Sequence, residues 1–584
     1  MAKESIVMRR ILLFVAVSVL LTGCGMAPGS FVAQVPTDGP IEEGQLVSNT
    51  SANQFIRVIA RPPRDGMTPT EIVQGFLESS ASFDNNHAVA RSYLTPEAAG
   101  DWDPNSGVIV YDGVPTLVEA GAAVLFSTTL NGRISNIGRY TVEDPGTQLQ
   151  QSFFLAQRDG QWRINLAPDG LLLSNFDVSR AYRSFPLYFF NPSFQTLVPD
   201  ARLIPVIGPA LGTTLIQRLI AGPNQWLRPV VRTGFPTGVE LAVDAVPIEN
   251  GIARVNLTAS VALANDAARV ALSQQIVWTL RQLPEVQFIE ILVNGTPLSV
   301  PGTSSPQSRD AWPEVNPNGL PVDAVGYAAT GAGLVRLTST GDISVLGEFG
   351  ALEEGAITKF AVSNNGKRVI ASTPNGELLW GSLLIGSAFE SVTPTADALV
   401  GAQSLAFDGD TTAWIVTDRG IAQTLLPTGE TYEIEIIGLD QGDFVQSVIP
   451  SRDGTRAAMI VSTATGFVLL LAQVSRPTPA NVTRIQLLKP MRVESKLSAV
   501  TALAWSSANT ISVIATETAG TLQIYEIDLG RGEVQAQGSP ADPVSIAAAP
   551  GLPSLVTSAD GSIYENSSQS WIVRIQGSAA AYPG

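Results

Sequence analysis

The fold of the C-terminal half is decided by the stretch Phe360-Ala-Val-Ser-Asn-Asn-Gly-Lys-Arg-Val-Ile370. It has the pattern of a short apolar strand, a turn with Asn-Gly and a second apolar strand. The pattern returns in Leu405-Ala-Phe-Asp-Gly-Asp-Thr-Thr-Ala-Trp-Ile415 and Val448-Ile-Pro-Ser-Arg-Asp-Gly-Thr-Arg-Ala-Ala458, and more weakly at 503–513 and 546–556. The equivalent positions are Ser363, Asp408, Ser451, Ser506 and Ala549, spaced 45, 43, 55 and 43 residues apart. A period of about 45 residues is typical of propeller blades.

Five copies and an unmatched start near Val325 predict an all-β propeller of five or six blades over residues 319–584. A β-sandwich is the alternative, but it gives no reason for an Asp/Asn-Gly turn at one phase of each repeat. The acids of Asp408-Gly-Asp410 suggest calcium at first sight. Two acids in a hairpin turn are normally solvated, so we predict no metal there.

Residues 183–302 carry a mixed pattern of helices and strands, and a Pro/Ser/Asn-rich linker is expected at 303–318. Asn250-Gly251 is a strong hairpin signal between two of the expected strands, 239–243 and 252–257. The other expected strands are 185–190, 203–207 and 288–293, and helices are expected at about 211–220 and 267–283. This region is therefore predicted to be an α/β domain.

Residues 54–182 are predicted to form an α+β domain. Thr68-Pro69-Thr70-Glu71 has the sequence of a capping box with Pro at the first helical position. Ile72, Val73, Phe76 and Leu77 follow at helical spacing, and a second helical patch covers 88–94. Strands are expected at 108–111, 123–126 and 153–156, followed by a hairpin through Arg158-Asp-Gly160. Helices followed by an antiparallel sheet are similar to the cone-shaped domains of the NTF2-like group.

The amino terminus has the pattern of a lipoprotein signal peptide over residues 1–23. Arg9-Arg10 precedes an apolar run from Ile11 to Leu21. This run is about 17 Å long as a helix, too short for a hydrocarbon core of about 30 Å. The tetrapeptide Leu21-Thr22-Gly23-Cys24 resembles a bacterial lipobox, which implies cleavage before Cys24, S-diacylglycerol on its thiol and N-acylation of the new terminus. The alternatives are an uncleaved anchor or an ordinary secretory signal, and either Met1 or Met8 is the start.

Residues 24–53 are expected to be a flexible tether after the lipidated Cys24, since they are small, polar and rich in Pro and Gly. Cys24 is the single cysteine in the chain, so a disulfide within one chain is impossible. A lipid on Cys24 would hold the protein at the outer face of the cell membrane.

Composition and motifs argue against several functions. The chain of 584 residues has a net charge of −17, which disfavours nucleic-acid binding. The single histidine, His87, follows Asp84-Asn85-Asn86 and is interpreted as a loop or helix-start residue. Without a second histidine or a nearby thiol, a zinc site is not expected. There is no G-x-S-x-G elbow and no phosphate-binding loop, so we predict no catalytic residues and no cofactor.

Two family resemblances follow from particular stretches. Leu219-Ile-Ala-Gly-Pro223, Ala253-Arg-Val-Asn-Leu257, Ile276-Val-Trp-Thr-Leu280 and Val286-Gln-Phe-Ile-Glu-Ile-Leu-Val-Asn-Gly295 resemble a GerMN domain, which has no assigned catalytic residues. With the lipobox, the propeller and the stretches 70–78, 87–98 and 107–113, nearly the whole chain resembles the LpqB lipoproteins of actinobacteria. That resemblance implies a partner, the extracytoplasmic domain of the MtrB sensor kinase, and a role in envelope homeostasis and cell division.

We therefore expect a membrane-anchored, non-catalytic accessory protein of a sensor kinase. The alternative is a protein that binds peptidoglycan or another envelope glycan. A hydrolase or lactonase built on the propeller is disfavoured because the propeller has no histidine and no nucleophile motif.

Overall fold

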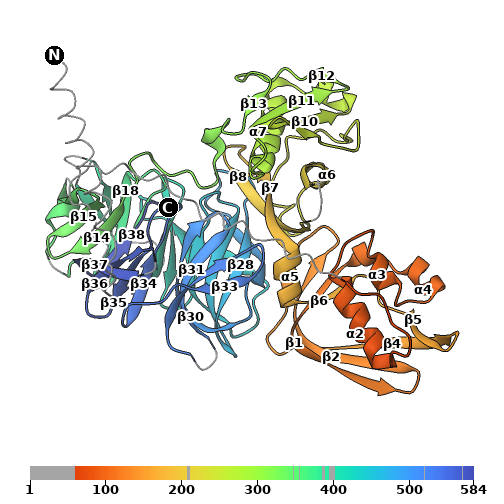
Figure 1. The fold of residues 1–584 in the computed structure, drawn as a ribbon. Helices are drawn as coiled ribbons and strands as arrows, with labels where there is room; N and C mark the ends of the chain where they lie inside the picture. Colours follow the sequence, from red (N-terminus) through yellow and green to blue (C-terminus); the bar gives the residue numbers. More distant parts are fainter. Residues whose placement is uncertain are drawn as a thin grey trace, which may run out of the picture. The chain divides into compact units, whose positions relative to one another are not determined.

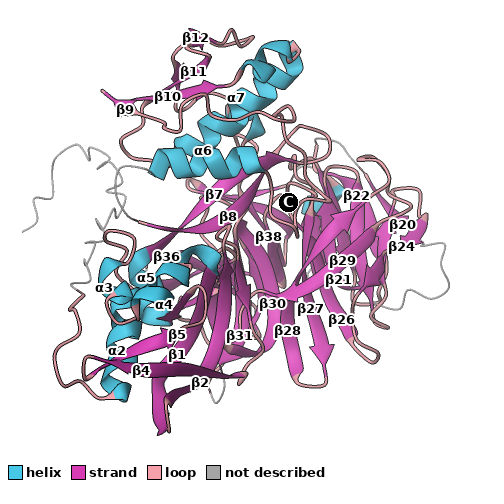
Figure 2. Cartoon of the chain, turned by 90° about the vertical axis from the view of Figure 1, so that its right-hand side faces the viewer, coloured by secondary structure: helices cyan, strands magenta, loops and turns pink. Residues whose placement is uncertain are grey.

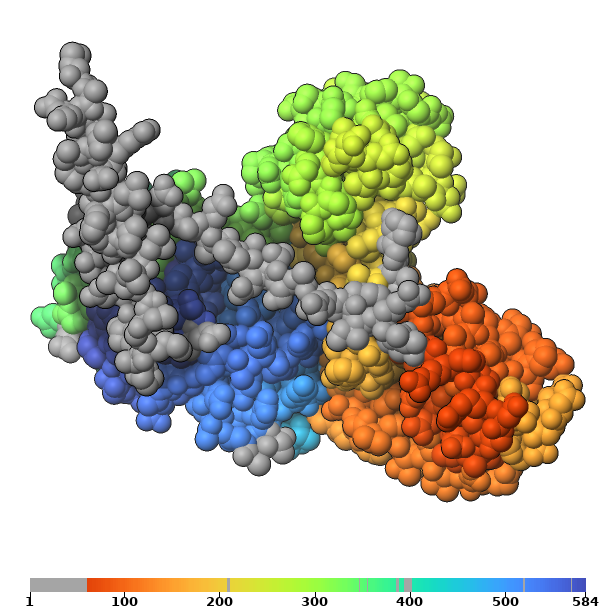
Figure 3. All heavy atoms as spheres, viewed as in Figure 1, coloured from red at the N-terminus to blue at the C-terminus, as the bar shows by residue number. Residues whose placement is uncertain are grey.

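A computed structural model describes residues 60–206, 211–345, 347–353, 355–384, 388–392, 402–517, 520–568 and 570–584 (Figure 1). The predicted lipobox Leu21–Cys24 and the predicted tether lie outside these residues. The described chain belongs to one compact unit that begins at Ile56. Within it, no helix has the length and apolar character needed to cross a membrane. Figure 3 draws the heavy atoms as spheres, with the described residues coloured by position in the chain.

The first domain is built from helices packed on a sheet. The capping box is present: Thr68 Oγ1 accepts from the Glu71 amide, and the Glu71 carboxylate accepts from the Thr68 amide at 2.7 Å. Helix α2 (Pro69–Ser80) buries Ile72, Val73, Phe76 and Leu77, as the helical spacing predicts. The other helices are α3 (Ala88–Arg91), α4 (Pro96–Asp101), the 3-10 turn η1 (Pro104–Ser106) and α5 (Asn175–Ala181).

The sheet of this domain has the order β5-β4-β2-β1-β6, with β3 paired to β2. Helix α2 contacts β1, β2, β5 and β6, and Figure 2 shows it beside the sheet. Asp159 and Gly160 have φ values of 51° and 76°, so they form the predicted two-residue hairpin turn. The strands are β1 (Gly107–Ala120), β2 (Ala123–Ser135), β3 (Tyr140–Val142), β4 (Gln148–Arg158), β5 (Gln161–Leu166) and β6 (Leu171–Ser174).

The second domain is α/β, as predicted. Strands β10 (Ile252–Leu257) and β11 (Phe288–Val293) pair in parallel, while β7 (Tyr182–Phe190) and β8 (Leu197–Pro205) form a separate antiparallel arm. The other elements are the helices α6 (Leu211–Ala221) and α7 (Asp266–Leu280), the 3-10 turn η2 (Ala259–Leu263), and the short strands β9 (Ile248–Glu249), β12 (Thr296–Pro297) and β13 (Gln307–Ser308).

The predicted strand at 239–243 is wrong. Asn250 and Gly251 do form a tight turn, with φ values of 51° and 77°, but they join β10 to β9. A two-residue turn pairs the residues that flank it directly, and Pro247, which has no amide hydrogen, precedes β9. Leu241 makes one isolated bridge to Leu257 at the far end of β10.

The segment predicted as a linker, 303–318, is packed onto the second domain. Gln307 is 3% exposed and pairs with Ile289 of β11. Its side-chain oxygen accepts from Ser273 Oγ at 2.6 Å and from Trp312 Nε1 at 3.0 Å. The 3-10 turn η3 (Pro313–Val315) follows. The segment is therefore packed against the second domain through the buried, hydrogen-bonded side chain of Gln307, and it is not a free linker.

The described residues of the C-terminal domain form six sheets, which fixes the blade number at six. The strands of the first three blades are β14 (Gly326–Thr330), β15 (Gly333–Thr338), β16 (Gly341–Ser344), β17 (Lys359–Val362), β18 (Arg368–Ser372), β19 (Leu378–Ser382), β20 (Phe389–Val392), β21 (Ala402–Asp408), β22 (Thr412–Thr417), β23 (Ala422–Leu425) and β24 (Thr431–Glu433), with the 3-10 turn η4 (Glu348–Ala351). The strands of the other three blades are β25 (Glu435–Ile437), β26 (Phe444–Pro450), β27 (Arg456–Thr463), β28 (Gly466–Ser475), β29 (Gln486–Arg492), β30 (Leu497–Ser507), β31 (Thr510–Glu517), β32 (Gln523–Asp528), β33 (Glu533–Ala536), β34 (Pro543–Ala547), β35 (Leu555–Ser558), β36 (Ser562–Ser567) and β37 (Ser570–Gln576).

The ring is closed by the last strand of the chain. Strand β38 (Ala579–Ala581) pairs with β14 and completes the first blade. Most adjacent blades contact one another through six strands, namely β38, β17, β21, β26, β30 and β34, while β30 also contacts β27 and β28 of the preceding blade. We call these six the innermost strands. The predicted repeat positions, from Ser363 to Ala549, all lie within two residues of the end of an innermost strand. The period read from the sequence is therefore the blade period.

The second domain and the propeller share one apolar core. Trp226 and Leu227 of the second domain belong to the same cluster of buried residues as Ile460 and Leu469 of the propeller. The first domain has its own core around Phe76, Phe126 and Phe153.

Candidate functional site

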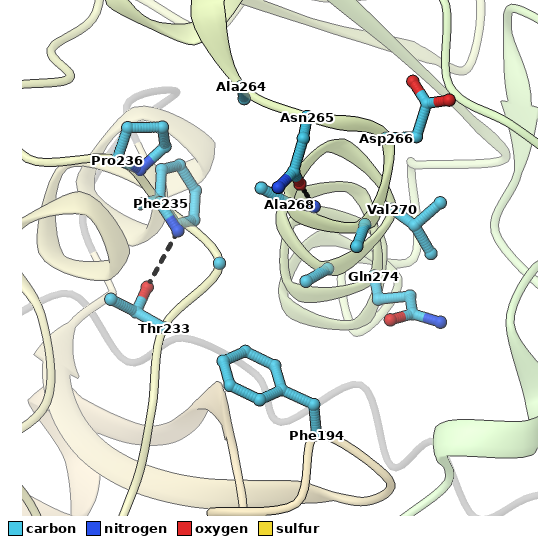
Figure 4. A pocket seen from close by; sticks show the side chains of 13 residues that line it. Phe194, Thr233, Phe235, Pro236, Ala264, Asn265, Asp266, Ala268, Val270 and Gln274 are labelled. Atoms are coloured by element: carbon cyan, nitrogen blue, oxygen red, sulfur yellow. Dashed lines mark hydrogen bonds between the residues drawn. The ribbon is translucent and has the colours of Figure 1, made fainter.

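A cavity of about 830 Å³ opens beside the first turns of α7 in the second domain. In Figure 4 the ring of Phe194 is directed toward the gap between the segment 233–236 and the helix. The helix contributes small side chains to this space. The apolar lining residues are Phe194, Phe235, Pro236, Ala264, Ala267, Ala268, Val270 and Ala271.

One wall of the cavity is fixed by a buried glutamine of α7. Gln275 is fully buried, and its side-chain oxygen accepts from the Gly234 amide at 2.6 Å and from Thr233 Oγ1 at 3.2 Å. Its Nε2 donates to the carbonyl of Tyr188 at 2.7 Å. A Cβ on Gly234 would lie 2.6 Å from the Leu272 amide nitrogen, so glycine is required for this close approach. The wall is therefore in place before any ligand arrives.

Phe194 is held in an unfavourable backbone conformation at the tip of the β7–β8 arm. Its φ is 59°, a left-handed value that is rare for bulky side chains, and it is 45% exposed. Asn191 Oδ1 holds the turn by accepting from the amides of Gln195 and Thr196 at 3.0 and 3.2 Å. The Phe194 ring packs on that of Phe190, with 5.2 Å between centroids. A strained, exposed aromatic residue beside a cavity is a candidate ligand contact.

Polar groups in the lining are few. Asn265 caps α7 by accepting from the Ala268 amide at 2.9 Å, and Gln274 Nε2 donates to Glu314 at 3.2 Å. Asp266 is the one lining residue with a formal charge, and Figure 4 shows its carboxylate pointing away from Phe194. The cavity can therefore take an uncharged, largely apolar group but has no charge partner for an ion.

The propeller offers much less space. Its central cavity has a volume of about 110 Å³ and is lined mainly by apolar residues of the innermost strands, among them Phe360, Leu405 and Trp505. Gly584 lies against it and donates its amide to the Val362 carbonyl at 3.0 Å. A polymer chain does not fit in this channel.

The acids considered for calcium have structural partners. Asp408 accepts from Arg476 Nη2 at 2.6 Å and from Trp414 Nε1 at 3.2 Å. Asp410 accepts from the Asn365 amide of the neighbouring blade at 2.8 Å. Among the described residues, no group of three or more His, Cys, Asp and Glu side chains is arranged to hold a metal ion.

His87 begins α3, as predicted, with a left-handed φ of 58°. The side chain is buried beside Phe83 and Trp102, with centroid distances of 4.9 and 5.9 Å. Burial lowers the pKa of the imidazole below 6.5, and nearby Arg91 lowers it further, while hydrogen bonds to the Ser80 and Ser82 backbone oppose the shift. The residue is therefore a neutral part of the first domain's core.

This environment predicts a pH effect on stability. Below about pH 6.5 the unfolded chain takes up a proton at His87 before the folded chain does, so folding stability falls as the pH falls. His87→Asn tolerates the left-handed backbone and does not titrate. We expect the melting midpoint of the wild type to drop more than that of the variant between about pH 7.5 and about pH 5.5. Equal pH dependence in both proteins would contradict this assignment.

Comparison with known proteins covers all three domains. Residues 62–179 match the family described as Lipoprotein LpqB, N-terminal domain, residues 186–299 match the sporulation and spore germination family, and residues 332–583 match the Lipoprotein LpqB beta-propeller domain. Lipoprotein LpqB of Thermobifida fusca is 31% identical over 97% of both chains, and that of Cutibacterium acnes is 27% identical over 97% of both chains.

Solved structures resemble parts of the chain. TolB from Acinetobacter baumannii has a TM-score of 0.35 and 14% identity, covering 44% of this chain and 66% of its own. The tandem GerMN domains of GerM from Bacillus subtilis have a TM-score of 0.20 and 23% identity, covering 23% of this chain and 47% of their own. With such low TM-scores, these likenesses support no statement about function.

The architecture defines a three-domain protein in which a GerMN domain lies between an α+β domain and a six-bladed propeller. Relatives that match over 97% of their length are named Lipoprotein LpqB. The chain belongs to the LpqB lipoprotein family.

Sequence reasoning did not find the cavity. Its walls come from the β7–β8 turn, the segment 233–236 and α7, which are far apart in the sequence. One local signal was available, since Asn191-Pro-Ser-Phe194 places a large aromatic residue inside a turn.

Proposed function

We propose that the protein is a lipoprotein, attached to the outer face of the cell membrane through Cys24, that acts as a non-catalytic accessory protein of a two-component sensor kinase. The observation that carries the binding role is the pre-formed apolar cavity in the GerMN domain. Membership of the LpqB family supports the lipid anchor. The kinase is proposed as the partner because the resemblance described in the sequence analysis implies it.

The anchor rests on the sequence before the described residues. Leu21-Thr22-Gly23 places small residues before the single cysteine of the chain, Cys24. An S-diacylglycerol group with an added N-acyl chain gives three hydrocarbon chains, and each buried CH2 contributes about 0.8 kcal/mol. The tether 24–53 would then confine the folded domains to partners near the membrane surface.

Replacing Cys24 should release the protein from the membrane. We expect Cys24→Ala to abolish incorporation of labelled palmitate and to move the protein from the membrane fraction to the soluble or secreted fraction. Thr22→Ala keeps a small residue before the cysteine and should remain labelled. Palmitate incorporation in Cys24→Ala equal to that of the wild type would contradict attachment through this cysteine.

The kinase partner is tested in cells. We expect crosslinking of the intact lipoprotein, followed by mass spectrometry, to recover the extracytoplasmic domain of a sensor kinase of the MtrB type. Sedimentation with purified cell wall tests the alternative, because an exposed aromatic ring such as that of Phe194 is also suited to stacking on sugars. Retention on cell wall with no crosslinked kinase would replace the proposed function with glycan binding.

A further inference from the structure

We propose that the cavity beside α7 binds an uncharged, extended segment of a protein partner, with one bulky apolar side chain inserted against Phe194. The proposal names a contact surface for the accessory role proposed above and rests on that role. Four observations support it. The wall of the cavity is held in place by Gln275, alanines of α7 leave space beside the helix, Phe194 has a strained backbone, and no charged side chain faces the cavity.

The shape of the cavity suits an inserted side chain. Ala267, Ala268 and Ala271 leave space along one side of α7, and Phe194 lies across from them (Figure 4). The wall is held by Gln275 and by the close contact of Gly234 with the helix, so binding would not have to order it. A pre-formed pocket that receives an apolar anchor is the usual centre of a protein interface.

The chemistry of the lining favours a peptide over a lipid. The first-turn amides of Asp266 and Ala267 have no acceptor within the helix, and Asn265 caps the amide of Ala268 instead. An acyl chain would bury these amides without an acceptor, whereas a peptide carbonyl satisfies them. An anionic lipid headgroup would find no cation among the residues that line the cavity.

The strain at Phe194 separates a binding role from a structural one. A left-handed φ is relaxed by glycine, so Phe194→Gly should melt no lower than Phe194→Ala. If the ring were present for stability, removing it would lower the melting midpoint. If it is present for binding, its removal weakens binding and leaves the melting midpoint near that of the wild type.

The test uses the full chain purified in detergent and fluorescein-labelled heptapeptides of Gly and Ser with a central Phe, Leu, Ala or Asp. We expect the Phe and Leu peptides to bind with a Kd on the order of 100 μM, and the Ala and Asp peptides at least about 10-fold more weakly. Phe194→Ala and Ala268→Trp, which fills the space, should each weaken binding of the Phe peptide by about 10-fold or more. Phe288→Ala is the matched control, because Phe288 is 44% exposed in the same domain and does not line the cavity.

Binding of the Phe peptide that is unchanged in Phe194→Ala and Ala268→Trp would overturn the proposal. So would saturable binding of phosphatidylglycerol vesicles or soluble cell-wall fragments, lost in the same variants, with no binding of the Phe peptide. The kinase is assayed separately with the same variants. If its extracytoplasmic domain is retained equally by all of them, this inference fails and the accessory function stands. If peptides bind through Phe194 but no kinase domain is retained by the wild type, the accessory function fails and this inference stands.

Discussion

Asp200→Ala is expected to lower the free energy of unfolding by about 3–5 kcal/mol, because it leaves the guanidinium of Arg202 buried without a counter-charge. The two side chains are 1% and 2% exposed. Arg202 donates from Nε to Asp200 Oδ1 at 3.0 Å and from Nη2 to Oδ2 at 2.6 Å. The effect should be measured as a shift of the denaturant midpoint of the full chain.

The loss should spread beyond the second domain, because the pair holds other segments. Arg202 Nη1 donates to the Ile137 carbonyl of the first domain at 2.9 Å. Asp200 also accepts from the backbone amide of Asn224 at 2.8 Å and from its Nδ2 at 2.6 Å. Asn224 Oδ1 in turn accepts from the amides of Trp226 and Leu227 at 2.8 and 3.0 Å. Asp200 thus fixes the turn that presents Trp226 to the propeller.

Two controls make this prediction specific. The exposed pair Arg158–Glu97 has side chains that are 59% and 65% exposed, so Glu97→Ala should lower the free energy of unfolding by no more than about 1 kcal/mol. In the double variant Asp200→Leu/Arg202→Met both charges are removed, and it should recover part of the stability lost in the single variant. A single variant within about 1 kcal/mol of the wild type would mean that water reaches Arg202 in solution.

The propeller was predictable because five of its six blades repeat one turn at one phase. Ser363, Asp408 and Ser451 end or follow innermost strands, and turns of this kind need particular residues whatever their surroundings. The blade number stayed at five or six because the first blade takes its innermost strand, β38, from the end of the chain. A strand contributed from so far along the sequence carries no local repeat.

In the second domain, local sequence signals did not predict the strand pairing or the packing of residues 303–318. Asn250-Gly251 predicted the turn correctly, but it did not determine which residues pair with β10. The pairing and the strand length depend on neighbouring residues outside the turn. The segment 303–318 was expected to be a linker from its composition, yet Gln307 is buried with its side-chain oxygen bonded to Ser273 and Trp312. The bond to Ser273 joins residues that are 34 apart in the sequence, so the composition of the segment gives no sign of it.

The cavity and the Asp200–Arg202 pair were missed for the same reason. Asp200 and Arg202 are two apart in a strand, on one face, which is a weak signal by itself. Their burial depends on Asn224 and on Ile137 of another domain. The cavity and the buried ion pair both depend on tertiary contacts between residues that belong to no sequence motif.

The second large effect is expected at Trp226, where the second domain meets the propeller. The ring is 8% exposed, and its Nε1 donates to the Lys489 carbonyl of the propeller at 3.0 Å. Arg139 of the first domain lies over the ring, 5.9 Å from its centroid. The backbone carbonyl of Trp226 accepts from the side-chain amide of Gln473. Trp226→Ala should therefore cost about 3–5 kcal/mol of unfolding free energy, as expected for removing a buried aromatic residue.

The same change should also separate the unfolding of the two domains. Trp226 lies in the core that the second domain shares with the propeller, so its loss removes packing that couples their unfolding. We expect calorimetry to show a split or broadened transition for Trp226→Ala.

Trp226→Phe keeps most of the packing and loses the bond to Lys489, so it should cost about 1–2 kcal/mol of unfolding free energy. Trp571→Ala, at a half-buried tryptophan between two blades of the propeller, should lower the midpoint without splitting the transition. A single transition in Trp226→Ala, shifted by less than about 1 kcal/mol, would show that the two domains do not depend on this contact for their joint unfolding.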